Sequence, residues 1–239
     1  MQPGIRPSHP GGRPPPRPLL TPAQRRPAGT LLAGCVAVMV VLAVMYRHHD
    51  RAGWLDAAVD PRLRTSLGAH PALLTPLVRL GDPPAGIVLT LALVLYCVAA
   101  RRWRGALLAG IAVPVASALT ELVLKPLVGR TLHGGPGFPS GHATSMFALA
   151  AVCAVLLANP PRARLSKAAR LALVLGAVLV AGLVSAAMVA REYHYATDAI
   201  AGATTGTAVV LLTALLLDRY RARTPARGSG VTVTAGAPG

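Results

Sequence analysis

Charged residues are scarce in this chain of 239 residues: Asp, Glu, Lys and Arg together make up 13% of it, and only 8 residues are acidic. An ordinary soluble domain carries about a quarter charged residues, so this class is excluded. Only 3 residues are cysteines, and all lie in apolar stretches, where a thiol behaves as a small apolar side chain. We therefore expect no disulfide. We also expect no thiol chemistry.

Hydrophobic residues make up 53% of the chain. They form six apolar stretches, at about residues 30–46, 84–100, 105–124, 143–159, 171–190 and 199–217. Each is close to the roughly 17–25 residues that cross a bilayer as a helix, and a helix satisfies its own backbone groups in hydrocarbon. The sequence therefore predicts an all-α polytopic membrane protein, a six-transmembrane-helix bundle over residues 30–217.

The basic residues are distributed unevenly along the chain. Sixteen of the 24 lie in the N-terminal arm and in the segments 101–104, 162–170 and 219–227, which six spans place on one side. Because segments rich in Lys and Arg stay cytoplasmic, we expect a multi-pass protein of the cell (plasma) membrane with both termini cytoplasmic. The net charge of +16 then indicates topology and some attraction to anionic lipid. Nucleic-acid binding is not expected, because no aromatic platform accompanies the charge.

The two ends of the chain differ from its apolar centre. Residues 1–29 hold nine prolines and five arginines without an apolar period, which predicts a disordered cytoplasmic arm; residues 218–239 predict a disordered cytoplasmic tail. The segment 46–83 is the longest connection, and its amphipathic part at 73–80 could lie along the membrane interface as a lid or be a plain connector. Its His48-His49-Asp50 run does not favour a metal site, because adjacent side chains point in different directions.

Polar residues gather where the third stretch ends and the fourth begins, on the predicted non-cytoplasmic side. Lys125 and Arg130 offer a point charge and a planar fork for phosphate oxygens, although snorkelling to headgroups explains either one alone. Ser140 fits an N-cap, Gly141 lets an anion approach the helix start, and His142 can donate a proton near neutral pH. An ordinary cap with an interfacial histidine is the alternative for this second group.

A third polar group, His194 and Asp198, opens the sixth stretch. Their spacing of i to i+4 places both side chains on one helix face. A carboxylate bonded to one imidazole nitrogen leaves the other free to attack phosphorus, whereas a purely structural histidine–aspartate bond is the alternative. Charged groups at membrane depth cost roughly 2.5–3.5 kcal/mol, which favours a functional role. Together, the three groups predict a phosphate-handling site on the extracytoplasmic side.

In these motifs the sequence resembles the type 2 phosphatidic acid phosphatase superfamily, over about residues 30–217. The family pattern is Lys…Arg-Pro, then Pro-Ser-Gly-His, then Arg…His…Asp, within a six-helix membrane bundle. The resemblance implies that His194 is the nucleophile and forms a phosphohistidine, that Asp198 orients it, and that His142 is the general acid. It also implies metal-independent chemistry, which fits the absence of a credible carboxylate cluster in the sequence. We therefore expect no metal and no cofactor.

The same resemblance assigns the phosphate ligands. It implies that Lys125, Ser140 and the amide of Gly141 hold the phosphoryl oxygens. The chain departs from the family where two arginines are expected, because Leu132 and Met188 stand at those positions. Arg130 and Arg191 are the nearby cations, and we expect these shifted residues to replace the missing arginines as phosphate ligands.

The resulting hypothesis is an integral membrane lipid phosphatase, a hydrolase for a phosphate monoester or diphosphate of a lipid. Phosphatidate, phosphatidylglycerol phosphate and polyprenyl diphosphate are all candidate substrates. The expected partners are the lipid phosphate and the membrane, and the sequence does not define an oligomeric state or a partner of the proline-rich arm. One alternative is a phosphotransferase that uses the same site with a lipid or sugar acceptor. Another is a noncatalytic protein that binds or transports phospholipids, which the missing arginines keep open.

Overall fold

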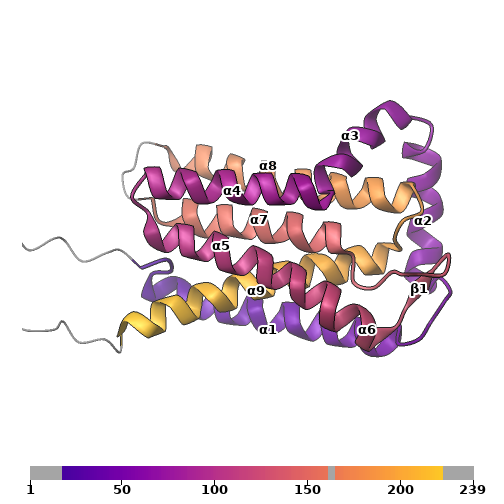
Figure 1. Ribbon diagram of the computed structural model, residues 1–239, viewed down its shortest axis with the longest axis horizontal. Coiled ribbons are helices and arrows are strands. Elements are labelled where there is room, and N and C mark those ends of the chain that lie inside the picture. The colour runs from indigo at the N-terminus through magenta and orange to yellow at the C-terminus, as the bar shows by residue number, and fades with distance from the viewer. Residues whose placement is uncertain (1–17, 161–164, 223–239) are drawn as a thin grey trace, which may run out of the picture.

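The structure, a computed structural model, describes residues 18–160 and 165–222. Its helices are α1 (Pro22–Met45), α2 (Trp54–Leu67), α3 (Pro71–Gly81), α4 (Pro83–Ala99), α5 (Trp103–Ala118), the π-helix η1 (Leu119–Leu124), α6 (Lys125–Val128), α7 (Gly141–Ala158), α8 (Lys167–Ala190) and α9 (Ala196–Ala222). A short antiparallel hairpin, β1 (Thr131–Leu132) and β2 (Gly135–Pro136), joins α6 to α7 (Figure 1).

Helix starts coincide with local sequence signals. Proline occupies the first turn of α1, α3 and α4, where its missing N–H costs nothing. The Ser140 hydroxyl caps α7 by accepting the N–H of Ala143 at 3.4 Å, which confirms the predicted N-cap. Ser166 caps α8 in the same way, accepting the N–H of Ala169 at 3.1 Å. These signals are local in sequence, so they fix the helix ends before any packing is considered.

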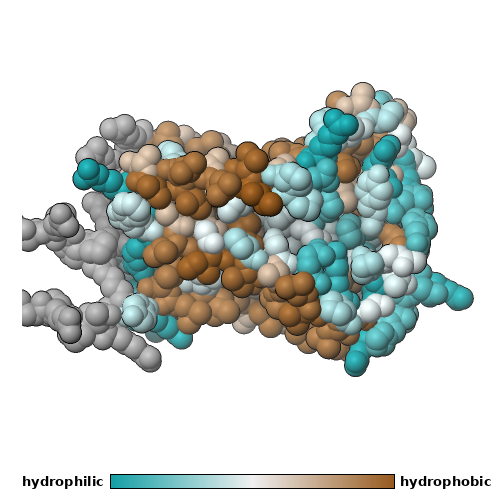
Figure 2. All heavy atoms as spheres, in the orientation of Figure 1, coloured by the Kyte–Doolittle hydropathy of each residue, from teal (hydrophilic) through white to brown (hydrophobic). Residues whose placement is uncertain are grey.

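The described residues contain five helices long and apolar enough to cross a membrane: α1, α7, α8, α9 and the run Trp103–Val128, which joins α5, η1 and α6. The pair α3 and α4, bent by 59° at its break, passes the same test together and makes a sixth span when the bent pair is counted as one. On the face shown in Figure 2, apolar side chains form a band across the middle of the bundle, with hydrophilic residues at its ends. The predicted all-α, six-transmembrane-helix bundle is confirmed.

Exposed aromatic residues mark both edges of this apolar band. Trp54 and Tyr193 are 75% and 50% exposed at one end of the bundle, and Tyr96, Trp103 and Tyr220 are exposed at the other. Tryptophan and tyrosine are enriched at membrane–water interfaces because their rings are amphipathic. The band between these aromatic residues is therefore the part of the molecule that faces lipid.

The three predicted site segments gather at one end. Helix α1 begins and α9 ends at the opposite end, whereas α2, α3 and the hairpin lie together at this one (Figure 1). Segment 46–83, expected to be a loop, forms α2 and α3, which pack on α8. It therefore covers the end of the bundle next to the site segments 125–142 and 191–198.

Helices α7 and α9 lie at the centre of the bundle and approach each other closely. A Cβ atom added to Gly202 would lie 2.5 Å from the carbonyl oxygen of Ser140 and 2.9 Å from Cβ of Ala143. A Cβ atom added to Gly206, one turn later, would lie even closer to the carbonyl oxygen of Thr144. This Gly-x-x-x-Gly spacing permits backbone contact between membrane helices, and it fixes α7 against α9 directly beneath their first turns.

The ordered bundle extends beyond the predicted boundaries at both ends of the chain. Asp218 is 3% exposed, and its carboxylate accepts the N–H groups of Leu19 at 3.0 Å and Leu20 at 2.8 Å and pairs with Arg104 at 2.8 Å. A buried carboxylate needs such partners, so residues 18–29 and 218–222 belong to the bundle. The predicted arm and tail are thus shorter than 1–29 and 218–239; residues 1–17 and 223–239 lie outside the described part.

Candidate active site

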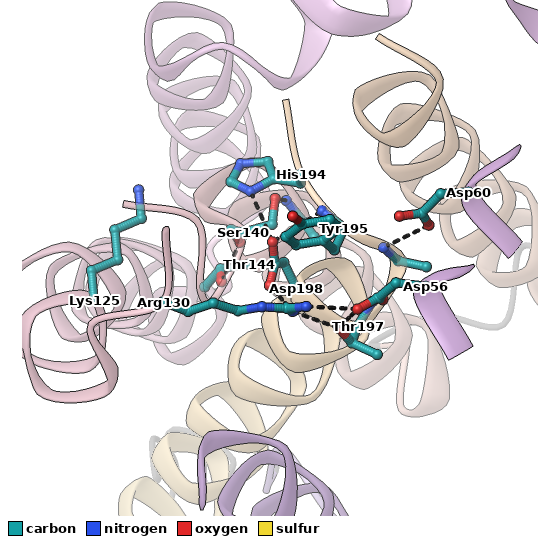
Figure 3. Close-up of polar contacts among 12 residues, drawn as sticks. Asp56, Asp60, Lys125, Arg130, Ser140, Thr144, His194, Tyr195, Thr197 and Asp198 are labelled. Atoms are coloured by element: carbon teal, nitrogen blue, oxygen red, sulfur yellow. Dashed lines mark hydrogen bonds and ion pairs between the residues drawn. The ribbon is translucent and has the colours of Figure 1, made fainter. Parts of the chain in front are cut away.

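His194 precedes the first turn of α9, and Asp198 lies within that turn. The Nδ1 atom of His194 is 3.7 Å from Oδ2 of Asp198, and the two residues are 8% and 0% exposed. The predicted pair is therefore present as a close contact rather than a hydrogen bond, and among the described residues Nδ1 has no hydrogen-bond partner. With Nδ1 directed to the carboxylate, Nε2 is the nitrogen left for chemistry (Figure 3).

His142 lies opposite His194. The two ring centroids are 6.2 Å apart with an interplanar angle of 61°. The main chain sets this placement, because the N–H of Ser140 donates to the carbonyl oxygen of Asp198 at 3.0 Å and ties the start of α7 to the start of α9. The structure thus brings together the two histidines that the sequence predicted from separate motifs.

An acidic residue outside the predicted set contacts His142. Oδ1 of Asp82, at the break between α3 and α4, lies 3.1 Å from Nε2 of His142. The neighbouring Gly81 leaves room for the ring, since an added Cβ would lie 3.0 Å from Cδ2 of His142. Asp82 had a usable sequence signal, because acids are few and it stands beside two prolines that start a span.

Lys125 lies beside the start of α7, as predicted, but with an acidic partner. Its Nζ atom is 2.8 Å from Oε2 of Glu121, four residues earlier in the π-helix η1. The other carboxylate oxygen, Oε1, lies against the α-carbon of Gly141, where an added Cβ would collide with it and would be 4.0 Å from Nζ of Lys125. The space predicted for phosphate therefore has Glu121 at its edge.

The position of Arg130 differs from the predicted one. Its guanidinium is buried, and Nη1 donates to Oδ1 of Asp198 and Oγ1 of Thr197, each at 2.6 Å, while Nη2 donates to Oδ2 of Asp56 at 2.6 Å (Figure 3). Both terminal nitrogens are committed to carboxylates, so Arg130 does not face the phosphate space. The reason is electrostatic: two buried carboxylates require a cation between them.

Two tyrosine rings complete the surroundings of this guanidinium. The Cζ atom of Arg130 lies 4.1 Å from the ring centroid of Tyr46 and 4.2 Å from that of Tyr195. Arginine stacks favourably on aromatic faces because the ring carries negative charge on its face. The tyrosine rings therefore pack against the guanidinium group, and the carboxylates of Asp56 and Asp198 accept hydrogen bonds from its terminal nitrogens.

Helix α2 supplies two acids that sequence reasoning missed. Asp56 Oδ1 accepts the N–H of Thr197 at 2.9 Å, and Asp60 Oδ1 accepts that of Ala196 at 3.1 Å. They satisfy the free N–H groups at the start of α9, and burial raises the pKa of the Asp60 carboxyl to about 6. Their spacing of i to i+4 in an acid-poor chain was the available signal.

Arg191 and the positions of the missing family arginines lie apart from this network. Arg191 is exposed at the end of α8, and the described residues show no hydrogen bond or ion pair of its side chain with the site. Met188 is 3% exposed in the core, and Leu132 lies in β1. A phosphate contact by Arg191 stays a prediction.

The fold and these facing histidines define a multi-pass α-helical membrane protein with a polar site at one end. The model of the PAP2 superfamily matches residues 106–222, a range that includes all three predicted motifs. The chain thus carries a PAP2 superfamily domain, which confirms the resemblance predicted from the sequence.

Among solved structures, the chain is similar to one described as the first transmembrane PAP2 type phosphatidylglycerolphosphate phosphatase, from Bacillus subtilis. The TM-score is 0.61 at 20% identity, and the match covers 79% of this chain and 96% of that one. At this identity the likeness shows a shared fold. A search of curated proteins gave no significant match.

Proposed function

We propose that this protein is an integral membrane lipid phosphatase that hydrolyses a phosphate monoester or diphosphate. The observation that carries the proposal is the pair of facing imidazoles, 6.2 Å apart, each with a carboxylate behind it. Histidines in this arrangement can act as nucleophile and proton donor to one phosphoryl group. The PAP2 domain and the fold shared with a named phosphatidylglycerolphosphate phosphatase support this reaction class.

The proposed reaction has two displacement steps. In the first, Nε2 of His194 forms a bond to phosphorus while the P–O bond to the lipid breaks, and His142 gives a proton to the departing oxygen. Asp198 stabilises the positive charge that develops on the His194 ring. In the second, a water molecule gives its proton to His142 and bonds to phosphorus, the P–N bond breaks, and phosphate leaves.

The phosphoryl oxygens are held at the start of α7 in this proposal. Lys125 supplies the positive charge, and the Ser140 hydroxyl and Gly141 amide supply hydrogen-bond donors at the positive end of the helix dipole. Because the Glu121 carboxylate lies against Gly141, it must move aside when phosphate binds. Charge that grows on the phosphoryl oxygens in the transition state is stabilised there.

We further propose that the site opens at the outer leaflet of the plasma membrane. The support is the excess of basic residues in segments at the opposite end of the bundle, which favours a cytoplasmic location for that end. A reporter fused to either terminus tests the orientation, since activity of an externally sensed reporter would reverse it. Phosphatidate, phosphatidylglycerol phosphate and polyprenyl diphosphate remain the candidate substrates.

The test is phosphate release from a panel of these lipids by detergent-purified protein, with a metal chelator present. We expect release by the wild type, loss in His194→Ala and an acid-labile phosphohistidine trapped on His194. His70→Ala, at an exposed histidine, is the matched control and should remain active. Product analysis with an added alcohol separates transfer to that acceptor from hydrolysis.

One observation favours a noncatalytic alternative, a protein that binds or transports phospholipids. Arg130 is committed to two carboxylates, and Lys125 shares its charge with Glu121, so less positive charge faces a phosphate than the family pattern provides. Binding of lipid phosphates without release of phosphate from any of them would support this alternative.

A further inference from the structure

We propose that Asp56 and Arg130 are positioning residues. Through Asp198, they fix the orientation and the tautomer of the ring of His194, the nucleophilic histidine. Their side chains form a continuous buried chain, Asp56–Arg130–Asp198, which we call the carboxylate clamp. Helix α2, which supplies Asp56, lies outside residues 106–222 matched by the family model. The catalytic consequence rests on the proposed function, whereas the effect on the His194 ring does not.

The clamp leaves Asp198 one orientation. Its Oδ1 atom accepts from Nη1 of Arg130 at 2.6 Å, and its Oδ2 atom accepts the N–H of Tyr195 at 3.0 Å. With both oxygens held from different sides, Oδ2 is the one that faces Nδ1 of His194, at 3.7 Å. A short further approach of the ring completes that hydrogen bond and fixes the tautomer with Nε2 unprotonated.

Arg130 is in turn held by Asp56 and by the tyrosine rings. The side chains of Arg130, Asp56 and Asp198 are all 0% exposed, so solvent does not screen their interactions. Asp56 bonds both Nη2 of Arg130 and the N–H of Thr197 at the start of α9. It therefore links the cation to the helix that carries Asp198.

The charges of the clamp also suit the proposed chemistry. Two carboxylates and one guanidinium leave one net negative charge beside His194, inside an apolar bundle. This charge favours the positive imidazole ring that forms when Nε2 bonds to phosphorus. Without Arg130, the two buried carboxylates of Asp56 and Asp198 would lie close together with no cation between them, an arrangement that is costly in an apolar interior.

A purely structural role for the clamp makes a different prediction. If Asp56 only caps α9, its loss lowers the melting temperature but leaves the reactivity of a folded site unchanged. If Asp56 positions Asp198, its loss changes the reactivity of the His194 ring in protein that remains folded. The reactivity of His194 separates the two roles, and it can be measured without any substrate.

The experiment is carbethoxylation of the full-length protein in detergent, with diethyl pyrocarbonate at pH 7 and well below the melting temperature. Peptide mass spectrometry gives the rate at His194 relative to His142, the internal reference. We expect this ratio to fall severalfold in Asp56→Asn and in Arg130→Met, with partial recovery in Arg130→Lys. Asp60→Asn is the matched control, because Asp60 caps the same helix outside the clamp, and its ratio should stay at the wild-type value.

Asp56→Asn carries the test if Arg130→Met does not fold, because the amide keeps the shape of the carboxylate. In the phosphatase assay, kcat should fall roughly 10- to 100-fold with little change in KM, as for outer partners of reacting groups. An unchanged His194 ratio in folded Asp56→Asn overturns the proposal. A reduced ratio in a protein that releases no phosphate supports the clamp and rejects the phosphatase function.

Discussion

The Nε2 atom of His142 lies 3.1 Å from Oδ1 of Asp82, so each of the two facing histidines has its own carboxylate. Asp82 stands between the end of α3 at Gly81 and the start of α4 at Pro83, and α4 is bent from α3 by 59°. The bend places this carboxylate over the first turn of α7. The second histidine is therefore oriented by a segment far from it in sequence, as the first is by the clamp.

We predict that Asp82→Asn weakens proton donation to the leaving oxygen. For lipid phosphates, whose alkoxide leaving groups need a proton, kcat should fall about 10- to 100-fold. For a nitrophenyl phosphate, whose leaving group departs without a proton, the loss should be small. Asp50→Asn is the control, since that side chain is 78% exposed. Equal losses with both substrates would contradict a role through the general acid.

The Asp60 carboxyl gives a prediction for stability against pH. Burial raises its pKa to about 6 from an ordinary value of 3.8, so the folded protein binds this proton more tightly than the unfolded chain. The contribution of Asp60 to stability therefore decreases as pH rises from about 4 to 6. Asp60→Asn, which mimics the neutral form, should raise the melting temperature relative to wild type more at pH 7.5 than at pH 4.5. A smaller difference at pH 7.5 would contradict this sign.

The helices and the three motifs were predictable because their causes are local. Apolar length defines the spans, and Ser140 and the prolines define helix starts within one turn. Two spans separate residues 125–142 from residues 191–198, so the chain returns to the same end of the bundle, whichever helices are neighbours. These predictions require no knowledge of which helices are neighbours.

The position of Arg130 was not predictable, because its partners are remote in sequence. It lies five residues after Lys125, and the sequence alone gives it no partner other than a phosphate. In the structure, α2 lies against the start of α9 and supplies Asp56 as its partner. The bond from Thr197 to Asp56 spans 141 residues, and that from Leu19 to Asp218 spans 199. The partners of a buried acid are the groups that the fold brings close to it in space, and one sequence does not reveal which groups these are.

Glu121 gives a prediction for phosphate affinity. In Glu121→Gln, Lys125 loses its carboxylate partner and the start of α7 loses a competing anion, so inorganic phosphate should inhibit more strongly. We expect the inhibition constant to fall roughly two- to fivefold, because a partly exposed ion pair is worth about 0.5–1 kcal/mol. Glu192→Gln, which breaks the pair with Arg64 at the same end, should leave the constant unchanged. Weaker inhibition in Glu121→Gln would instead show that Glu121 positions Lys125 for the substrate.

Gly202 gives a prediction that links helix packing to the site. In Gly202→Ala, the new Cβ would lie 2.5 Å from the carbonyl oxygen of Ser140. Helices α7 and α9 must therefore separate near their first turns, next to His142 and His194. Overpacking of this kind costs about 1–3 kcal/mol, and we expect a lower melting temperature together with a lower kcat. Gly176→Ala is the matched control, because nothing lies within 4 Å of its added Cβ and alanine favours a helix. An equal response of the two variants would show that the close α7–α9 contact does not align the site.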